Sequence, residues 1–390
     1  MPCPSPSSTI ISSTAPAMAS FQDLPVELGV AIMKYVDTPQ DISAMIRADP
    51  RLLHCFLDNR KQVMTPHTTK IMEVCGGHVS TAYLLAARLR HAKKNPAFND
   101  TRPQHREQII SPILQSCMRS HNTHHHVSHR ASLATICELS TLAIDVGWLT
   151  TSYIFQALKQ IFGYYLQPAD WPRASPEERQ SFINAACRFE GYVQAFFHME
   201  QPLFPRDESI RRLLFSPRLC GSEPRNRIDE RLRFYSVAYY IYDQHCTMMK
   251  NINRHLSAST KAINGKDQDN GEVADDRQKW RLQNCEQIEV NKYVHYLTSE
   301  GLGMLLYLQS MALEDQLQFV LSSFESILDS PHPNVLMVPG IDLYEIGTVE
   351  KHRWSPWVDC EDVFEINPEQ WKVAESFWVI GGPHYRSIWY

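Results

Sequence analysis

Apolar side chains recur at intervals of three and four residues through most of this chain. That spacing places them on one face of an α-helix, whereas a half-buried strand alternates apolar with polar residues. The pattern is clearest over residues 176–199 and 228–249, and the best candidate for a strand is the short run 335–338. Further helices are predicted over residues 78–90, 106–118, 131–146, 151–166, 304–308, 317–321 and 324–328. The sequence therefore predicts a mainly α protein, in which a small N-terminal helical unit precedes an irregular α-helical domain.

Composition restricts the partners and the location that we expect. Hydrophobic residues make up 43% of the 390 residues and charged residues 21%, the balance of a chain that buries a core. The net charge of −5 is not the basic excess that nucleic-acid-binding proteins usually carry. No run reaches the roughly 18 apolar residues of a membrane-spanning helix, so neither nucleic acid nor a membrane is predicted as a partner. Ten cysteines without a CxxC pair, and no targeting signal in residues 1–20, favour a cytoplasmic or nuclear location.

Three helix starts follow one another between residues 21 and 63. The first is expected at Asp23, with Pro25 in the first turn. Thr38-Pro39-Gln40-Asp41 predicts the second, because an N-cap hydroxyl and an acidic residue three positions later resemble a capping box. Asp49-Pro50 predicts the third. A unit of this size cannot bury a large core, so we expect some of its apolar side chains to be covered elsewhere.

The composition divides the chain into four parts. Residues 1–20 are rich in Ser, Thr and Pro and are expected to form a disordered tail, followed by the helical unit at 21–63. The helical body is expected over 64–330, with a mobile insertion at 257–278, where large apolar residues are scarce. Residues 331–390 carry five tryptophans and are expected to pack back on the body, because so much exposed apolar surface would be adhesive.

The N-terminal unit contains a run of residues that is typical of one family. Leu24-Pro25-Val26-Glu27-Leu28, then Ile32, Tyr35-Val36, Asp41-Ile42 and Met45-Ile46, resembles the F-box. That pattern is Leu-Pro-x-Glu-Ile/Leu, an apolar residue four positions on, and a short second helix opened by an acidic–apolar pair. The run Ile46-Arg47-Ala48-Asp49-Pro50 is similar to the form common in fungal F-box-like proteins, whereas the usual Val-Cys/Ser-x-x-Trp ending is missing.

The resemblance implies that the protein is an adaptor. F-box proteins recruit the Skp-type linker of a cullin ubiquitin ligase and present a substrate through the rest of the chain. The implied partners are therefore a Skp-type linker protein and an unknown protein substrate. The residues expected to contact the linker are Leu24, Pro25, Leu28, Ile32, Val36, Ile42 and Ile46.

Two other interpretations remain open. The N-terminal helices can belong to a non-catalytic structural or interaction protein with a degenerate F-box, which the missing tryptophan ending favours. The helical body can instead be an enzyme with dispersed catalytic residues, which requires His, Cys or carboxylate side chains to converge in a polar pocket. None of the repeats that other F-box proteins use to bind substrates is visible in the sequence.

Local motifs indicate no particular chemistry. His121, His124, His125, His126 and His129 are the densest group of possible metal ligands. On a helix, His121, His125 and His129 would share a face and could bind zinc, copper or nickel, but their polar setting favours a surface loop. Cys75 near His78 is the first pair to inspect for cysteine–histidine catalysis. The sequence predicts no catalytic residue, no cofactor and, apart from these weak histidine candidates, no metal site.

Overall fold

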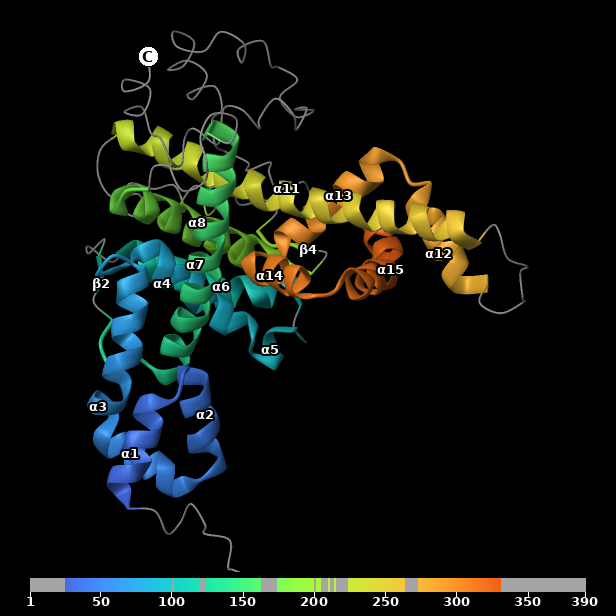
Figure 1. Ribbon diagram of the computed structural model, residues 1–390. Coiled ribbons are helices and arrows are strands. Elements are labelled where there is room, and N and C mark those ends of the chain that lie inside the picture. Colours follow the sequence, from blue (N-terminus) through green and yellow to red (C-terminus); the bar gives the residue numbers. More distant parts are fainter. Residues whose placement is uncertain are drawn as a thin grey trace, which may run out of the picture. The chain divides into compact units, whose positions relative to one another are not determined.

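The computed structural model is mainly α, as predicted (Figure 1). It describes residues 25–99, 102–119, 124–125, 127–162, 174–199, 201–204, 210, 214, 224–263 and 273–330. Within these residues the strands are two short antiparallel pairs, β1 (Val79–Ser80) with β2 (His124–His125) and β3 (Phe197–His198) with β4 (Gln201–Pro202). The predicted tail at 1–20, the predicted strand at 335–338 and the tryptophan-rich segment 331–390 lie outside the described residues.

The chain divides into two compact units, with the boundary between His67 and Thr68. The first unit contains α1 (Val26–Tyr35), α2 (Pro39–Ala48) and most of α3 (Pro50–Val74). α3 bends at Asn59, whose φ of −113° and ψ of 18° are not helical, and it continues beyond the end expected near residue 63.

Two of the three predicted helix starts are confirmed in detail. Thr38 and Asp41 form the capping box of α2, in which Thr38 Oγ1 accepts from the backbone N–H of Asp41 at 3.2 Å. Asp49 Oδ1 accepts from the backbone N–H of Arg51 at 2.8 Å where α3 begins. The start of α1 differs from the prediction, because Pro25 is its N-cap and not part of its first turn, and Asp23 lies outside the described residues.

The first unit has a small core of its own. Cys55 Sγ donates to the carbonyl oxygen of Val26 at 3.4 Å, which joins the start of α1 to α3. Met33 from α1, Ile42 from α2 and Phe56 from α3 are buried, so each helix contributes a large apolar side chain to the unit.

The second unit is larger and is built from many helices of very different length. They are α4 (Thr81–Lys93), α5 (Pro96–Asn99), α6 (Pro103–Arg119), α7 (Leu133–Phe162), α8 (Pro176–Phe196), α11 (Pro224–Ile263), α12 (Val273–Gln283), α13 (Gln287–Ser299), α14 (Leu302–Ser310) and α15 (Leu313–Asp329).

Helix α8 lies at the centre of the second unit and packs against α4, α7 and α11. It begins with a capping box between Ser175 and Glu178, and Pro176 occupies the first turn. The aromatic residues of its predicted apolar face are buried. Tyr192 contacts Phe234 of α11 edge to face, with ring centroids 5.5 Å apart. A second apolar cluster joins α11 to α13 and α15, and Tyr293 and Phe324 lie in it with ring centroids 5.1 Å apart.

Two helices are longer than the sequence predicted. The expected helices at 131–146 and 151–166 form the single helix α7, which passes through Gly147 without a break. The expected mobile insertion at 257–278 is helical at both ends, because α11 continues to Ile263 and α12 begins at Val273.

Helix α7 is also more apolar than expected. Residues 133–159 are long and apolar enough to cross a membrane by length and composition alone, and 56% of the apolar window is buried inside the second unit. A core helix meets the same criterion, and α7 carries Glu138 and Asp145, which form ion pairs with α4. We therefore interpret α7 as a core helix of the second unit.

Candidate functional site

Helix α1 in the first unit carries apolar side chains on two sides. Gly29, Val30 and Met33 face the core and are buried. Leu28 is 50% exposed and Ile32 37% exposed, and their spacing of four residues places them one turn apart on another face. Tyr35, which is 79% exposed, extends this stripe by one turn. We call Leu28, Ile32 and Tyr35 the α1 stripe. Three large apolar side chains in a row on an exposed helix face are typical of a surface that binds a partner.

The residues expected to contact a linker lie in three different settings. Pro25, Leu28 and Ile32 are exposed, and Val36 and Ile46 are half-buried. Leu24 lies outside the described residues. The side chain of Ile42 is completely buried and belongs to the core of the first unit. Pro39 and Ile42 are the buried residues of α2, so they form the side of this helix that faces the core.

Sequence reasoning missed a second exposed apolar pair in the same unit. Leu53 is 37% exposed and Leu57 54% exposed, and they lie one turn apart on α3 before the bend. Their signal was available in the sequence, because Leu52, Cys55 and Phe56 already supply the core face of this helix segment.

A recess in the first unit is lined mainly by polar residue types and contains none of the predicted contact residues. Its volume is about 460 Å³, and it is lined by Lys34, Asp58, Asn59, Lys61, Gln62, Thr65 and Pro66. It opens beside the bend of α3, where Asn59 Nδ2 donates to the carbonyl oxygen of Cys55 at 3.1 Å. The α1 stripe and this recess are therefore separate features.

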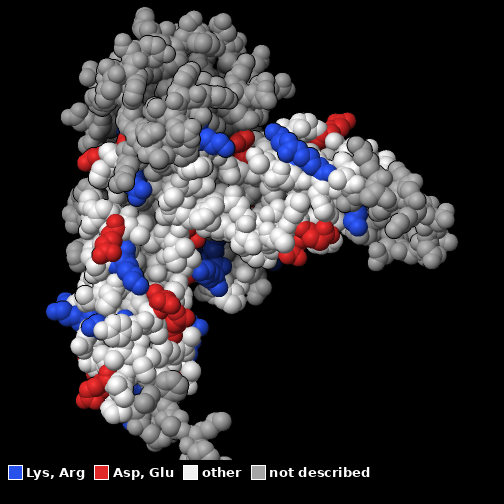
Figure 2. All heavy atoms as spheres, viewed as in Figure 1, with Lys and Arg blue, Asp and Glu red and all other residues white. Residues whose placement is uncertain are grey.

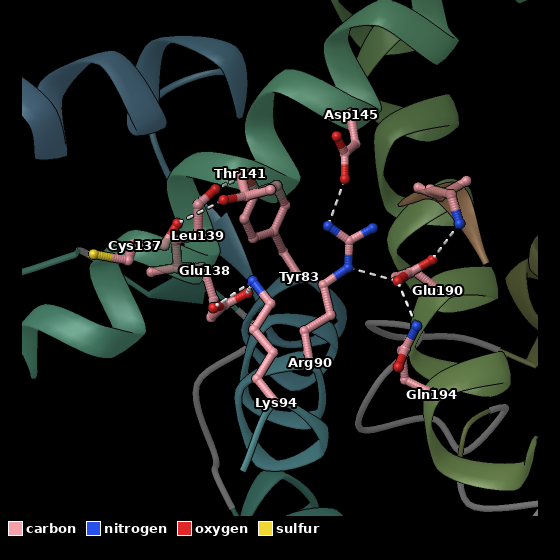
Figure 3. A network of polar contacts seen from close by, with 11 residues as sticks. Tyr83, Arg90, Lys94, Cys137, Glu138, Leu139, Thr141, Asp145, Glu190 and Gln194 are labelled. Atoms are coloured by element: carbon pink, nitrogen blue, oxygen red, sulfur yellow. Dashed lines mark hydrogen bonds and ion pairs between the residues drawn. The ribbon is translucent and has the colours of Figure 1, made fainter. Parts of the chain in front are cut away.

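The second unit contains a buried ionic network between α4, α7 and α8 (Figure 3). Arg90 of α4 points between two carboxylates. Its Nη1 lies 2.5 Å from Asp145 Oδ2 on α7, and its Nε lies 2.5 Å from Glu190 Oε1 on α8. Burial alone would lower the pKa of Arg90, but the two carboxylates outweigh it and raise that pKa. Arg90 is therefore charged and tightly held.

Glu190 connects this network to a fourth helix. Its side chain is fully buried and also accepts from Gln194 Nε2 at 2.9 Å and from the backbone N–H of Leu302 at 2.8 Å. Leu302 is the first residue of α14, so a carboxylate lies at the positive end of that helix. The close approach requires glycine at the N-cap: Gly301 has φ of +85°, and a Cβ there would lie 2.6 Å from Glu190 Oε2.

A second pair of contacts fixes α4 on α7. Lys94 Nζ lies 2.8 Å from Glu138 Oε1, and Tyr83 OH donates to the carbonyl oxygen of Leu139 at 2.8 Å (Figure 3). Burial raises the pKa of Tyr83, so its hydroxyl keeps the proton that this bond needs. Together these contacts make the network a structural element that holds helices from distant parts of the sequence.

The most important member of the network is Glu190, and its position in the sequence already indicated that it belongs to the core. Glu190 lies four residues after Ala186 and three before Val193, on the same helical face that carries the apolar residues of 176–199. A carboxylate at such a position must find a buried cation or several donors. Its partners could not be read from the sequence, because Arg90 lies 100 residues away.

Part of the histidine cluster lies in a short strand and a turn. His124 and His125 lie in strand β2, where they pair with Ser80 and Val79, and His129 lies in a turn. His125 Nε2 lies 3.2 Å from Thr81 Oγ1, and His121 and His126 are outside the described residues. His124 and His125 are therefore held by backbone pairing with β1 and not on a helix. In the part of the chain that the structure describes, no three His, Cys, Asp or Glu side chains could hold a metal ion.

Cys75 is not suited to nucleophilic catalysis. Its side chain is almost completely buried, and burial raises the pKa of its thiol to about 12. The reactive form of cysteine is the thiolate, which is negligible at neutral pH for such a pKa. The proximity of Cys75 and His78 in the sequence therefore does not indicate a catalytic pair. The described cysteines form no disulfide.

Comparisons with known proteins add no assignment. No family model, no curated protein and no solved structure matches this chain.

Proposed function

We propose that the protein is an F-box-like adaptor, which binds a Skp-type linker through its first unit and an unknown protein substrate through its second. The α1 stripe is the observation that carries this proposal. Leu28 and Ile32 are among the residues that the F-box resemblance assigns to the linker, and both are exposed on one helix face. An F-box that had become only part of the core would bury them.

The proposed contact surface differs from the set expected from the sequence. Pro25, Leu28 and Ile32 remain in it, and Ile42 is removed because it is buried. Tyr35 joins it as a large, mostly exposed aromatic residue at the end of the stripe. Aromatic side chains are enriched among the residues that dominate binding energy at protein interfaces.

The test is co-purification of the full chain with a Skp-type linker from the same organism. The double variant Leu28→Asp, Ile32→Asp should lose the linker, because each truncated apolar contact at the centre of an interface costs about 2 kcal/mol or more. The matched control is Ile288→Asp on α13, which changes an apolar residue that is 71% exposed in the other unit and should leave binding unchanged.

Circular dichroism of each variant separates lost binding from lost folding. Stoichiometric binding by the wild type and by Ile288→Asp, with none by a folded stripe variant, would support the adaptor. A folded wild type that never retains the linker would overturn the proposal and leave a structural or interaction protein with a degenerate F-box.

A further inference from the structure

Helix α7 carries a row of exposed apolar side chains in the second unit. Ile144 is 62% exposed, Trp148 39% and Phe155 55%, and the exposed Thr151 completes the row. At 3.6 residues per turn, these four positions fall within about 60° of one another around the helix axis. Single exposed apolar residues are common on protein surfaces, whereas several large ones aligned on one helix face are typical of an interaction surface. We call these four residues the α7 face.

The exposed side of α7 is almost free of charge. Between residues 133 and 158 the sequence contains two charged residues, Glu138 and Asp145. Both are buried and form ion pairs with α4, so they lie on the core side of the helix. In Figure 2 the surface over the middle of α7 is mostly white, the colour of residues other than Lys, Arg, Asp and Glu. A surface without charge does not repel an identical copy of itself, whereas a surface of one charge does.

The centre of the α7 face can be covered by another helix without losing a hydrogen bond. Thr151 Oγ1 donates to the carbonyl oxygen of Gly147 at 3.0 Å, so its hydroxyl group has a partner within the helix. Gly147 borders the face, and a Cβ added there would meet no atom within 4 Å. Two small residues beside Trp148 therefore leave room for a large side chain of a second helix.

The spacing of the α7 face makes it complementary to itself when two copies run antiparallel. Its members are four, three and four residues apart, the alternation that is found where helices pack in coiled coils. A twofold axis midway between Trp148 and Thr151 places Trp148 of one copy opposite Thr151 of the other. The same axis places Ile144 opposite Phe155. A large side chain therefore meets a small one at the centre, and two apolar side chains meet at each end.

We propose that the protein forms an antiparallel homodimer through the α7 face. This inference does not depend on the adaptor function, because the α1 stripe belongs to the other unit. From Ile144 to Phe155 the face is about 16 Å long, at 1.5 Å per residue. It is smaller than a standard protein interface, so we expect a dissociation constant on the order of 10 µM.

Sedimentation equilibrium of the full chain, from 1 to 200 µM, tests the proposal. The wild type should change from monomer to dimer over this range. Ile144→Glu should weaken the dimer at least about thirtyfold, because the symmetry places the buried charge in the interface twice. The matched control is Ile288→Glu on α13, which makes the same change at a residue that is 71% exposed and should leave the dimer unchanged.

A double variant tests the direction of pairing. In Ile144→Glu, Phe155→Lys the opposite charges are three turns apart within one chain, but they face each other twice in the antiparallel dimer. This variant should associate at least about tenfold more tightly than Ile144→Glu alone. In a parallel pair the second substitution would only remove another apolar contact, and association would weaken further.

Circular dichroism must show that each variant keeps its helical content. Should Ile144→Glu lose it, Thr151→Glu provides the same test, because it places two like charges beside the twofold axis at an exposed position. A folded wild type that is monomeric at 200 µM would overturn the proposal and leave the α7 face to another occupant, such as residues 331–390. A dimer that the folded single variant leaves intact, or a double variant that associates more weakly than the single one, would also overturn it.

Discussion

At the scale of single residues, Glu190 contributes most to the buried ionic network. Glu190→Gln keeps the shape of the side chain but leaves Arg90 with Asp145 as its remaining carboxylate. We expect a loss of about 3–5 kcal/mol in the free energy of unfolding, as for other buried pairs that lose one partner. Chemical denaturation followed by circular dichroism would measure it.

A surface pair provides the control for that substitution. Glu325 Oε1 lies 3.8 Å from Arg281 Nη1, and both side chains are more than one-third exposed. Glu325→Gln should change the free energy of unfolding by about 0.5 kcal/mol or less. Similar losses in the free energy of unfolding of the two variants would show that the buried network stabilises the protein no more than the surface pair does.

His245 on α11 predicts a dependence of stability on pH. It is completely buried, and among the described residues neither ring nitrogen has a hydrogen-bond partner. Burial lowers its pKa to about 3. In the unfolded chain the pKa is about 6.5, so between these values the unfolded state binds the proton. The contribution of His245 is therefore fully present above pH 6.5 and is lost as the pH falls toward 3.

Replacing this ring tests the assignment. His245→Leu removes the titrating group, so stability should fall less steeply below about pH 6.5, by up to about 1.4 kcal/mol for each pH unit. The measurement is the free energy of unfolding of both proteins at pH 7.5, 6 and 4.5. Parallel curves would mean that the buried ring is not the group that is protonated on unfolding.

Residue types at helix starts could be predicted from the sequence, and distant pairs could not. Thr38, Asp41 and Asp49 act on backbone groups within three residues, so the local sequence contains the whole interaction. Arg90 meets Asp145 across 55 residues and Glu190 across 100. Nothing near Arg90 in the sequence distinguishes it from Arg88, which is exposed on the same helix.

At the scale of helices, we expect opposite effects on stability from replacing two glycines of one short segment, Gly301 and Gly303. Gly301→Ala forces a Cβ to within 2.6 Å of Glu190 Oε2 at a φ of +85°. We expect it to destabilise the protein by about 1–3 kcal/mol, the range for a strained backbone position. Thermal and chemical denaturation would measure the change.

Gly303 is the matched control inside α14. A Cβ at this exposed position meets no atom within 4 Å, so Gly303→Ala adds helix propensity without strain. It should stabilise the protein by about 0.5–1 kcal/mol. Two changes of the same sign would contradict the role assigned to the contact between Glu190 and the N-terminus of α14.

Helix boundaries were the least predictable feature at this scale. The sequence predicted a break between residues 146 and 151, but α7 continues through these residues, and Val146 and Leu149 are buried there. Local propensity is a weak prior when both flanking turns pack in a core.

At the scale of the whole molecule, the division into two units predicts that they can be destabilised separately. Ile42→Ala removes a fully buried side chain from the first unit and should cost about 2–5 kcal/mol. Hydrogen exchange should then accelerate in the amides of α1, α2 and the start of α3, and remain unchanged in α8. Gly301→Ala should give the converse result.

Combining the two substitutions gives a stricter test. Their effects on exchange should add without coupling, because each acts on a separate core. Accelerated exchange in α8 of the Ile42→Ala variant would show that the two units unfold as one.

The bond between Glu190 and Leu302 also sets the order in which the molecule can be completed. A ribosome delivers α4, α7 and α8 first, and the backbone donor of α14 emerges 112 residues after Glu190. Until then a carboxylate in the middle of the nascent body lacks one of its donors, and water must satisfy it. A truncated chain that ends before α14 therefore contains an incompletely bonded carboxylate in α8, far along the sequence from the point of truncation.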